Sequence, residues 1–385
     1  MTEQQSEERF DLRSTYSDNL PKILAALDIS LVVTSYQAAQ LIMIRTNGEN
    51  IVTASKAFPR PMGLHVDGDR ITLGTETQVL SFNRSDGLLA EVKSGAFDDT
   101  SQMTKKAQEK NTAAQEEFIR ERNAAINDVK KADSLYLHRA AITTGMINIH
   151  DIAWGDEGLW VVNSVFSCLA TLSPDHSFVA RWMPPFVSAL APANRCHLNG
   201  MAMRDGQPAY VTTFNRGDHL DSWTSQQARN QGTLIDVQTN RILIDDLILP
   251  HSPRYHDGWI YVCESGRGVV WQVNPLDGAR KQVVKLPGFV RGLAFYGDLM
   301  WVGLSRLRDS ETGWDMPLRD EFAETVSGIW LVSLRNNQII AHLQFEDEVH
   351  QLYDIGIVPG SLHPELLGLD SPLIRHLYDY SEDFL

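Results

Sequence analysis

One short pattern recurs six times along this chain, and it constrains the fold more than any other feature. Each copy is a short apolar strand that enters a Gly or Asp turn, and the copies start at Met62, His150, Asn199, His251, Arg291 and Tyr353. A second apolar segment follows each of the first five copies, at residues 71–74, 159–162, 209–212, 259–262 and 300–303. Repeats of roughly 40–50 residues built from short strands are typical of a β-propeller. The pattern therefore predicts an all-β fold, a six-bladed β-propeller. The alternative is that it marks ordinary hairpins in another β architecture.

The incomplete sixth copy predicts how the ring closes. Near the N-terminus, residues 31–35 and 40–44 look like the second and third strands of a repeat without a first strand. The copy at Tyr353 is a first strand without a second or third. Pairing these two ends would complete a sixth blade and remove exposed sheet edges, which otherwise invite aggregation. We therefore expect the strand around Ile355 to pair with the strand around Val32.

The repeats define a propeller at residues 29–360, preceded by an N-terminal extension at 1–28 and followed by a C-terminal tail at 361–385. Residues 98–131 are rich in Lys, Glu, Gln, Ala and Asn and contain no Pro or Gly. This composition predicts a solvated helix inserted between two repeats, either as a surface feature or as a lid or homo-oligomer contact. Insertions at 216–231 and 306–325 leave from the ends of second strands, on the face where binding loops usually gather.

Composition limits the partners and the compartment. Acidic residues outnumber basic ones by 49 to 34, for a net charge of −15, which argues against nucleic acid and anionic membranes as partners. No apolar run approaches the ~18 residues of a transmembrane helix, and residues 1–13 are polar and acidic, unlike a signal peptide. We interpret Cys168, Cys196 and Cys263, an odd and widely spaced set, as reduced thiols of a cytoplasmic protein.

The first residues of the six copies form what we call the inner ring, because the innermost strands of a propeller line its central channel. Five of these six residues are polar, which is costly on an inner strand unless water, ions or a ligand satisfy them. The residues that follow them form the second ring: Gly63, Asp151, Gly200, Ser252, Gly292 and Asp354.

The two rings predict a candidate metal site. Its ligands would have the nitrogen and oxygen donors that Zn, Ca or Fe accepts: His150, Asn199, His251 and Asp151. The candidates for general acid or base are His197, Tyr353 and Asp354. The other interpretation is a hydrated polar channel without a metal. There is no glycine-rich phosphate-binding motif, so no nucleotide cofactor is expected.

Arginines form a second theme. Several precede a first strand or follow a second strand, which would gather them on one face of an otherwise acidic protein. Guanidinium groups suit carboxylate and phosphate, so the pattern predicts an anionic ligand. The candidate substrate-binding residues lie near these strand ends: Arg291, Arg267, Glu264, Arg216, Arg306 and Tyr36.

Four segments resemble an uncharacterised bacterial family of conserved hypothetical proteins that carry a domain of unknown function: residues 149–155, 196–202, 250–254 and 286–295. The resemblance spans about residues 29–360, with residues 98–131 as a departure, and it implies a β-propeller-like fold without an established activity. More distantly, the architecture is similar to gluconolactonase-type lactonases and peptide-amidating lyases, which place a divalent metal at the channel mouth. That similarity is an analogy of fold alone.

Two classes of function follow. The first is an enzyme that acts on a small anionic metabolite or a modified peptide at the channel mouth, with or without a metal, as a hydrolase, lyase or isomerase. The second is a non-catalytic propeller that binds a peptide or protein on its top face. A scaffold of that kind needs exposed apolar and aromatic anchors, whereas the polar inner ring favours the enzyme.

Overall fold

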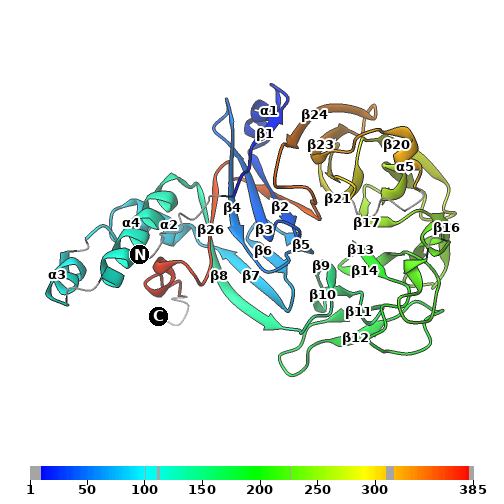
Figure 1. Ribbon diagram of the computed structural model, residues 1–385, viewed down its shortest axis with the longest axis horizontal. Coiled ribbons are helices and arrows are strands. Elements are labelled where there is room, and N and C mark those ends of the chain that lie inside the picture. The colour runs from blue at the N-terminus through cyan, green and yellow to red at the C-terminus, as the bar shows by residue number, and fades with distance from the viewer. Residues whose placement is uncertain (1–9, 100, 111–112, 226, 309–315, 381–385) are drawn as a thin grey trace, which may run out of the picture.

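The computed structural model describes residues 10–99, 101–110, 113–225, 227–308 and 316–380. Their strands form six sheets, which surround a common centre (Figure 1). Parts of the predicted N-terminal extension, the three insertions and the C-terminal tail lie outside the described residues.

Four of the sheets follow the chain in order, each starting with an inner strand that carries the repeated pattern. The first of them contains β9 (Ile149–Gly155), β10 (Gly158–Asn163), β11 (Cys168–Thr171) and β12 (Val179–Trp182). The next contains β13 (Leu198–Arg204), β14 (Gln207–Thr213), β15 (Gly232–Asp236) and β16 (Ile242–Leu247). The third contains β17 (Pro250–His256), β18 (Trp259–Glu264), β19 (Val269–Val273) and β20 (Arg280–Lys285). The fourth contains β21 (Phe289–Tyr296), β22 (Leu299–Ser305), β23 (Ser327–Ser333) and β24 (Gln338–Phe345).

The fifth sheet joins the two ends of the chain. Its strand order is β25 (Ile355–Pro359), β2 (Ile29–Ser35), β3 (Gln40–Thr46) and β4 (Ile51–Ala57). The pairing expected from the sequence is present, since β25 runs antiparallel to β2 with Val32 opposite Gly356. All seven residues of β2 are buried, as expected for a strand covered on both faces by neighbouring sheets.

The sixth sheet carries the helical insertion. Its antiparallel strands are β5 (Leu64–Val66), β6 (Arg70–Gly74), β7 (Gln78–Arg84) and β8 (Ser134–Thr143). Between β7 and β8 come α2 (Asp86–Lys93), α3 (Ser101–Lys110) and α4 (Ala113–Lys131), which project to one side (Figure 1). The inserted helices therefore connect two strands of one sheet, rather than lying between two repeats as the sequence suggested.

Both terminal segments contribute to sheets. In the predicted N-terminal extension, β1 (Ser14–Tyr16) pairs with β24, and α1 (Leu20–Leu27) packs its buried leucines against the core. In the predicted tail, β26 (Pro364–Leu367) pairs parallel with β8, and the 3-10 segment Pro372–Arg375 buries Leu373 with residues of α2 and α4. A short helix, α5 (Pro317–Glu321), and 3-10 turns at Ser222–Thr224, Ala228–Asn230 and Ser265–Arg267 lie in connecting loops.

Apolar side chains between neighbouring sheets form the core, for example Trp301, Leu331 and Ile355 in one buried cluster. None of the described helices is long and apolar enough to cross a membrane.

Candidate functional site

The whole inner ring lines one cavity of about 230 Å³. The ring of Tyr353 links its members, since the His150 and His251 rings lie 5.7 and 6.5 Å from it, centroid to centroid. The guanidinium carbon of Arg291 lies 5.4 Å from the same ring and 5.2 Å from the ring of Tyr36. Because each inner strand enters its sheet at the same level, residues nearly 300 positions apart in sequence reach one site.

Two oxygen atoms hold His150 in one tautomer. Its Nδ1 lies 2.9 Å from the backbone oxygen of Asn148 and 2.6 Å from Ser164 Oγ. A carbonyl oxygen can only accept, and the Ser164 hydroxyl donates its own hydrogen to the backbone oxygen of Leu198, so Nδ1 carries the proton of the neutral ring. Nε2 is then an acceptor, and it has no hydrogen bond with a described residue.

The same support repeats at His251. Its Nδ1 lies 2.9 Å from the backbone oxygen of Leu249 and 2.8 Å from Ser265 Oγ, and the Ser265 hydroxyl donates to the backbone oxygen of Val290. In both cases the carbonyl comes from the second residue before the histidine, and the serine ends the hairpin that the histidine begins.

Arg291 has the corresponding serine. Its Nε donates to Ser305 Oγ at 3.0 Å, and that hydroxyl donates to the backbone oxygen of Leu352 at 2.9 Å. Each serine thus connects one inner-ring residue to the carbonyl just before the next one along the chain. The repeat therefore supplies both the inner-ring side chain and its support.

His197, the residue two positions before Asn199, is oriented in a similar way. Its Nδ1 lies 3.0 Å from Asn194 Oδ1, and the amide nitrogen of Asn194 donates to Asp221 Oδ1 at 3.2 Å. That second bond identifies the Asn194 oxygen as the atom facing His197, so Nδ1 is again the protonated nitrogen. The His197 ring packs against Trp223 and Phe214, with centroids 4.3 and 4.4 Å away.

Five residues that line the cavity have a left-handed backbone although none is glycine: Arg60, Asn148, Asn194, His197 and Leu249, with φ between 42° and 57°. Such conformations cost on the order of 1–3 kcal/mol each and tend to cluster at functional sites. At Asn148 and Leu249 the backbone turn places the carbonyl oxygen on Nδ1 of the histidine two residues later.

Asn199 completes the polar lining. Its side chain is only 2% exposed, and its amide nitrogen has no hydrogen-bond partner in the described part of the protein. A buried amide without a partner is costly, so this residue favours a ligand or water in the cavity.

Arginines contribute to the lining of the cavity in an otherwise acidic protein. Its described lining includes Arg60, Arg291 and Arg308 but no Asp or Glu. Burial, followed by the charges of Arg60 and Arg291, lowers the pKa of His150 to about 4. Burial lowers the pKa of His197 and His251 well below 6.5 and raises that of Tyr353 well above 10. At neutral pH the imidazoles are therefore uncharged and the phenol is protonated.

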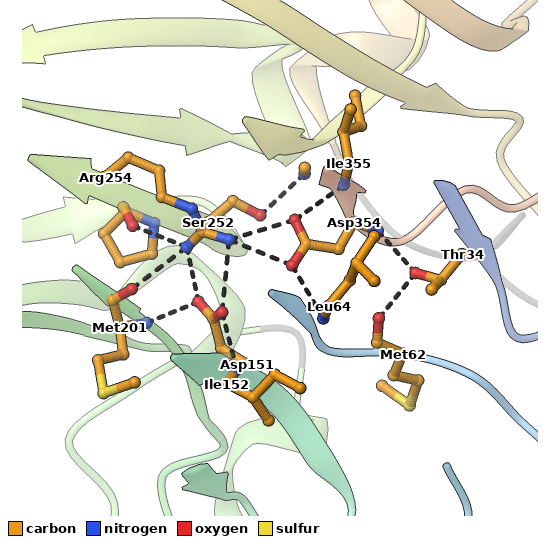
Figure 2. Close-up of polar contacts among 12 residues, drawn as sticks. Thr34, Met62, Leu64, Asp151, Ile152, Met201, Ser252, Arg254, Asp354 and Ile355 are labelled. Carbon is orange, nitrogen blue, oxygen red and sulfur yellow. Dashed lines mark hydrogen bonds and ion pairs between the residues drawn. The ribbon is translucent and has the colours of Figure 1, made fainter. Parts of the chain in front are cut away.

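A charged layer lies directly below the cavity, at the second ring. Figure 2 shows the Arg254 guanidinium between two carboxylates, donating to Asp151 Oδ2 at 2.7 Å and to both oxygens of Asp354 at 3.2 Å. Backbone N–H groups of Ile152 and Met201 also donate to Asp151, each at 3.0 Å. The layer thus connects the sheets of β9, β17 and β25.

Two buried carboxylates share one guanidinium in this layer. Burial opposes the charge of Arg254, but Asp151 and Asp354 together raise its pKa above the ordinary value. The second carboxylate is not fully compensated, and burial raises the pKa of Asp354 to about 7. A second cavity, of about 400 Å³, lies further along the same inner strands and includes Asp151 and Arg254 in its lining.

Small residues allow the strands to approach at this layer. The second ring alternates glycine with Asp or Ser around the six sheets. A Cβ on Gly200 would lie 2.4 Å from Pro253 Cδ, and one on Gly63 would lie 3.1 Å from the Asp151 Cα. Larger residues at these positions would push the inner strands apart.

The structure brings together seven of the predicted site residues in the cavity lining: Tyr36, His150, His197, Asn199, His251, Arg291 and Tyr353. Their chemical roles stay predictions.

Six predicted residues lie outside the cavity lining. Asp151 and Asp354 bind Arg254 in the layer below, so their carboxylates do not join the histidines. Among the described residues, no group of three or more His, Cys, Asp and Glu side chains is placed to hold a metal ion.

The other four residues are engaged elsewhere. Glu264 is fully buried and accepts hydrogen bonds from the Ile248 backbone N–H, Arg267 Nε and Trp271 Nε1. Arg216 pairs with Asp245 at 3.5 Å, and Arg306 donates to the backbone oxygens of Phe345 and Glu346. Arginines do lie at the strand ends, as the sequence predicted, but Arg216, Arg267 and Arg306 form ion pairs or hydrogen bonds with nearby residues.

Sequence reasoning missed Arg254 and the supporting serines. The serines were detectable, because the inner-ring residues His150, His251 and Arg291 are each followed fourteen positions later by Ser164, Ser265 and Ser305. Arg254 was detectable as well, since the equivalent position is Ala153, Ala202, Ala294 or Gly356 in four other copies.

Comparisons with known proteins agree with this architecture. The family described as "Domain of unknown function (DUF4915)" matches residues 18–367. A comparison with curated proteins gives no match. Among solved structures, the chain is similar to the crystal structure of a nidogen/laminin complex, with a TM-score of 0.51 and 11% identity over 86% of this chain and 99% of that one. At this identity the likeness shows a propeller-like fold and nothing more. Because the family match covers most of the sequence, this protein belongs to the family described as "Domain of unknown function (DUF4915)".

Proposed function

We propose that the cavity lined by the inner ring binds a small anionic molecule and that the protein is an enzyme acting on it, as a hydrolase, lyase or isomerase. One observation carries the proposal. In a protein of net charge −15, three arginines and no described carboxylate line a cavity that also holds three neutral histidines. A volume of about 230 Å³ suits a small metabolite, since drug-sized ligands occupy pockets of roughly 300–1,000 Å³.

The same residues support proton transfer. Each neutral imidazole has its Nδ1 proton held by the protein and its Nε2 lone pair available to accept a proton. A bound anion would raise the lowered pKa values of these rings toward the range in which a general base works. Tyr353 stays protonated beside them and would donate a hydrogen bond or a proton to a developing negative charge.

A metal-assisted form of this enzyme is part of the proposal. Asp151 binds Arg254 and is therefore left out of the ligand set. The remaining residues that could hold Zn, Ca or Fe are His150, His251 and Asn199, with His197 nearby. The Nδ1 bonds to carbonyl oxygens would orient the two ligating rings. A bound metal would polarise a carbonyl group or activate water. Elemental analysis of protein purified without a histidine tag tests whether a metal is present.

Calorimetric titration with carboxylates and inorganic phosphate tests the anion site. We expect binding that weakens with added salt, and a loss of about ten-fold or more in affinity for Arg60→Ala and Arg291→Lys, because charge-assisted hydrogen bonds contribute about 1.5–3 kcal/mol. Arg280→Ala is the matched control, since Arg280 pairs with Asp246 on an outer strand. Equal affinity in all three variants would contradict the proposal. A lower melting temperature without weaker binding would give Arg291 a structural role.

A second candidate function is the binding of a peptide or protein on the face of the molecule where the inner-ring cavity lies. It is favoured by three exposed apolar side chains on loops that flank the cavity in sequence: Met146, Leu190 and Leu220, which are 58%, 47% and 68% exposed. Replacing all three by serine separates the candidates, because the anchors are removed while the cavity lining is unchanged.

We also infer that the six sheets are the blades of one closed propeller, with β25 completing the blade of β2, β3 and β4. The antiparallel pairing of β25 with β2 supports this closure, as does the arrangement of the sheets around one centre (Figure 1).

A further inference from the structure

We infer that the anion bound in this cavity also carries a hydroxyl group, so that the site is built for a small hydroxycarboxylate rather than for a simple carboxylate. This inference rests on the proposed anion site and specifies its substrate class.

Three histidine rings place hydrogen-bond acceptors in the cavity. His150, His251 and His197 all place Nδ1–H on a protein oxygen, so each ring presents Nε2 as a lone pair. A simple carboxylate offers only acceptors and cannot satisfy these nitrogens. A ligand that satisfies these Nε2 atoms must therefore supply a hydrogen-bond donor.

A hydroxyl group suits this cavity better as a donor than an ammonium group does. An ammonium group that donated to His150 would lie near Arg60 and Arg291, whose charges already lower the pKa of that ring, so a further cation there is unfavourable. A hydroxyl group donates without adding positive charge. The cavity thus selects a hydroxyl as the donor and an anionic group as the partner of the arginines.

Asn199 adds a hydrogen-bond donor to the cavity. Its buried amide nitrogen has no partner among the described residues, and it would donate to a ligand oxygen. A hydroxyl oxygen can accept that bond while its hydrogen is donated to a histidine Nε2. In chain order the sheets of His150 and Arg291 are separated by two others, so a molecule with its hydroxyl near His150 and its carboxylate near Arg291 would span the cavity.

Matched pairs of ligands test the inference. Malate and succinate differ by one hydroxyl group at equal charge, as do lactate and propionate, and calorimetry or ligand-observed NMR measures the affinity of each. We expect the hydroxylated member of at least one pair to bind about ten-fold or more tightly, because a cavity built to bond a hydroxyl leaves its own groups unpaired when the hydroxyl is missing. Equal affinities within both pairs would overturn this inference and leave the anion site intact. No binding by any of the four would overturn the proposed function and this inference with it.

Variants locate the hydroxyl contact. His150→Phe removes Nε2 and keeps a ring, so the preference for malate over succinate should shrink while succinate affinity changes little. His256→Phe is the matched control, since His256 lies at the other end of β17, stacks on Phe295 and bonds the backbone oxygen of Gly297. It should keep the full preference. An unchanged preference in folded His150→Phe and in the equivalent His251 and His197 variants would overturn the assignment of the hydroxyl to the histidines.

A direct measurement covers the case in which the His150 variant does not fold. In wild-type protein labelled with ¹⁵N-histidine, the nitrogen shifts of a neutral ring distinguish the two tautomers. We expect the three cavity histidines to carry the proton on Nδ1 at neutral pH. Protonation on Nε2 would remove the acceptors and overturn the inference.

Discussion

The character of His150 and His251 depends on a backbone turn just before each ring and on a hydroxyl group behind it. A left-handed residue two positions earlier turns its carbonyl oxygen onto Nδ1, and a serine at the end of the same hairpin adds a second oxygen. Burial then keeps each ring neutral. The imidazole that a ligand would meet is thus defined by its backbone and by a hydroxyl behind it, and the strained turns are the structural cost of that definition.

The neutral histidines predict a pH dependence of stability. In the unfolded chain a histidine titrates near pH 6.5, whereas the pKa of His150 is lowered to about 4 in the fold. Between these two pKa values the unfolded state binds more protons than the folded state. The stability that comes from keeping His150 neutral is therefore complete above pH 6.5. It is lost as the pH falls, by up to about 1.4 kcal/mol per pH unit. His150→Phe should flatten the decline of unfolding free energy between about pH 6.5 and pH 5, measured by urea denaturation. The exposed His176→Phe is the control. The same slope in both variants and the wild type would contradict the prediction.

The sequence predicted the inner ring because a repeat brings equivalent positions to one level of the axis, and that rule does not depend on side-chain detail. It could not place Asp151 and Asp354 correctly, since their partner Arg254 comes from a third sheet. Which carboxylates face a ligand and which face an arginine is decided by contacts across the centre. Those contacts involve residues about 100 positions apart, beyond the reach of local patterns.

At the level of strands and helices, the repeated pattern located the inner strand and its partner in each copy, and the partnerless ends predicted the pairing of β2 with β25. The outer additions were missed. β1 and β26 are short and pair with the edges of other sheets, and neither segment carries the repeat. The helix prediction captured α3 and α4 but not α2, whose three buried apolar residues face α4 and the C-terminal segment.

The proposed closure through β25 predicts a marked effect of truncation. Deleting residues from Tyr353 onward removes β25, leaves β2 as an open edge and takes away Asp354, so we expect an aggregating product, as judged by size-exclusion chromatography. A chain that stops after Asp370 keeps β25 and β26 and is the control. It should stay folded with reduced stability, because Leu373 and Leu377 of the lost segment are buried. A soluble, cooperatively unfolding product from the shorter of the two chains would argue against closure.

Over the whole molecule, the layer of Asp151, Arg254 and Asp354 is the polar junction between three sheets that are not neighbours in chain order. It lies between the cavity of the inner ring and the larger cavity further along the inner strands. Glycines around it let neighbouring inner strands approach closely. The layer separates two cavities: three arginines and three histidines contribute to the described lining of one, and Asp67, Asp151 and several aliphatic residues to that of the other.

Removing the central arginine should therefore destabilise the whole protein in a pH-dependent way. Arg254→Met leaves two buried carboxylates facing each other, and breaking a buried pair costs about 3–5 kcal/mol. The loss of unfolding free energy should be largest near pH 8 and smaller near pH 5.5. Burial already raises the pKa of Asp354 to about 7, so the folded variant takes up a proton as the pH falls to 5.5. The unfolded aspartate titrates near 3.9 and takes up none in this range, so the lower pH favours the folded state. Arg280→Met is the control, since its partially exposed pair with Asp246 contributes only about 0–1 kcal/mol. Adding Asp151→Asn and Asp354→Asn to Arg254→Met should recover much of the stability, because the unpaired charges are gone. Urea denaturation at the two pH values measures all three effects. A small, pH-independent loss of unfolding free energy in Arg254→Met would show that this layer does not hold the three sheets together.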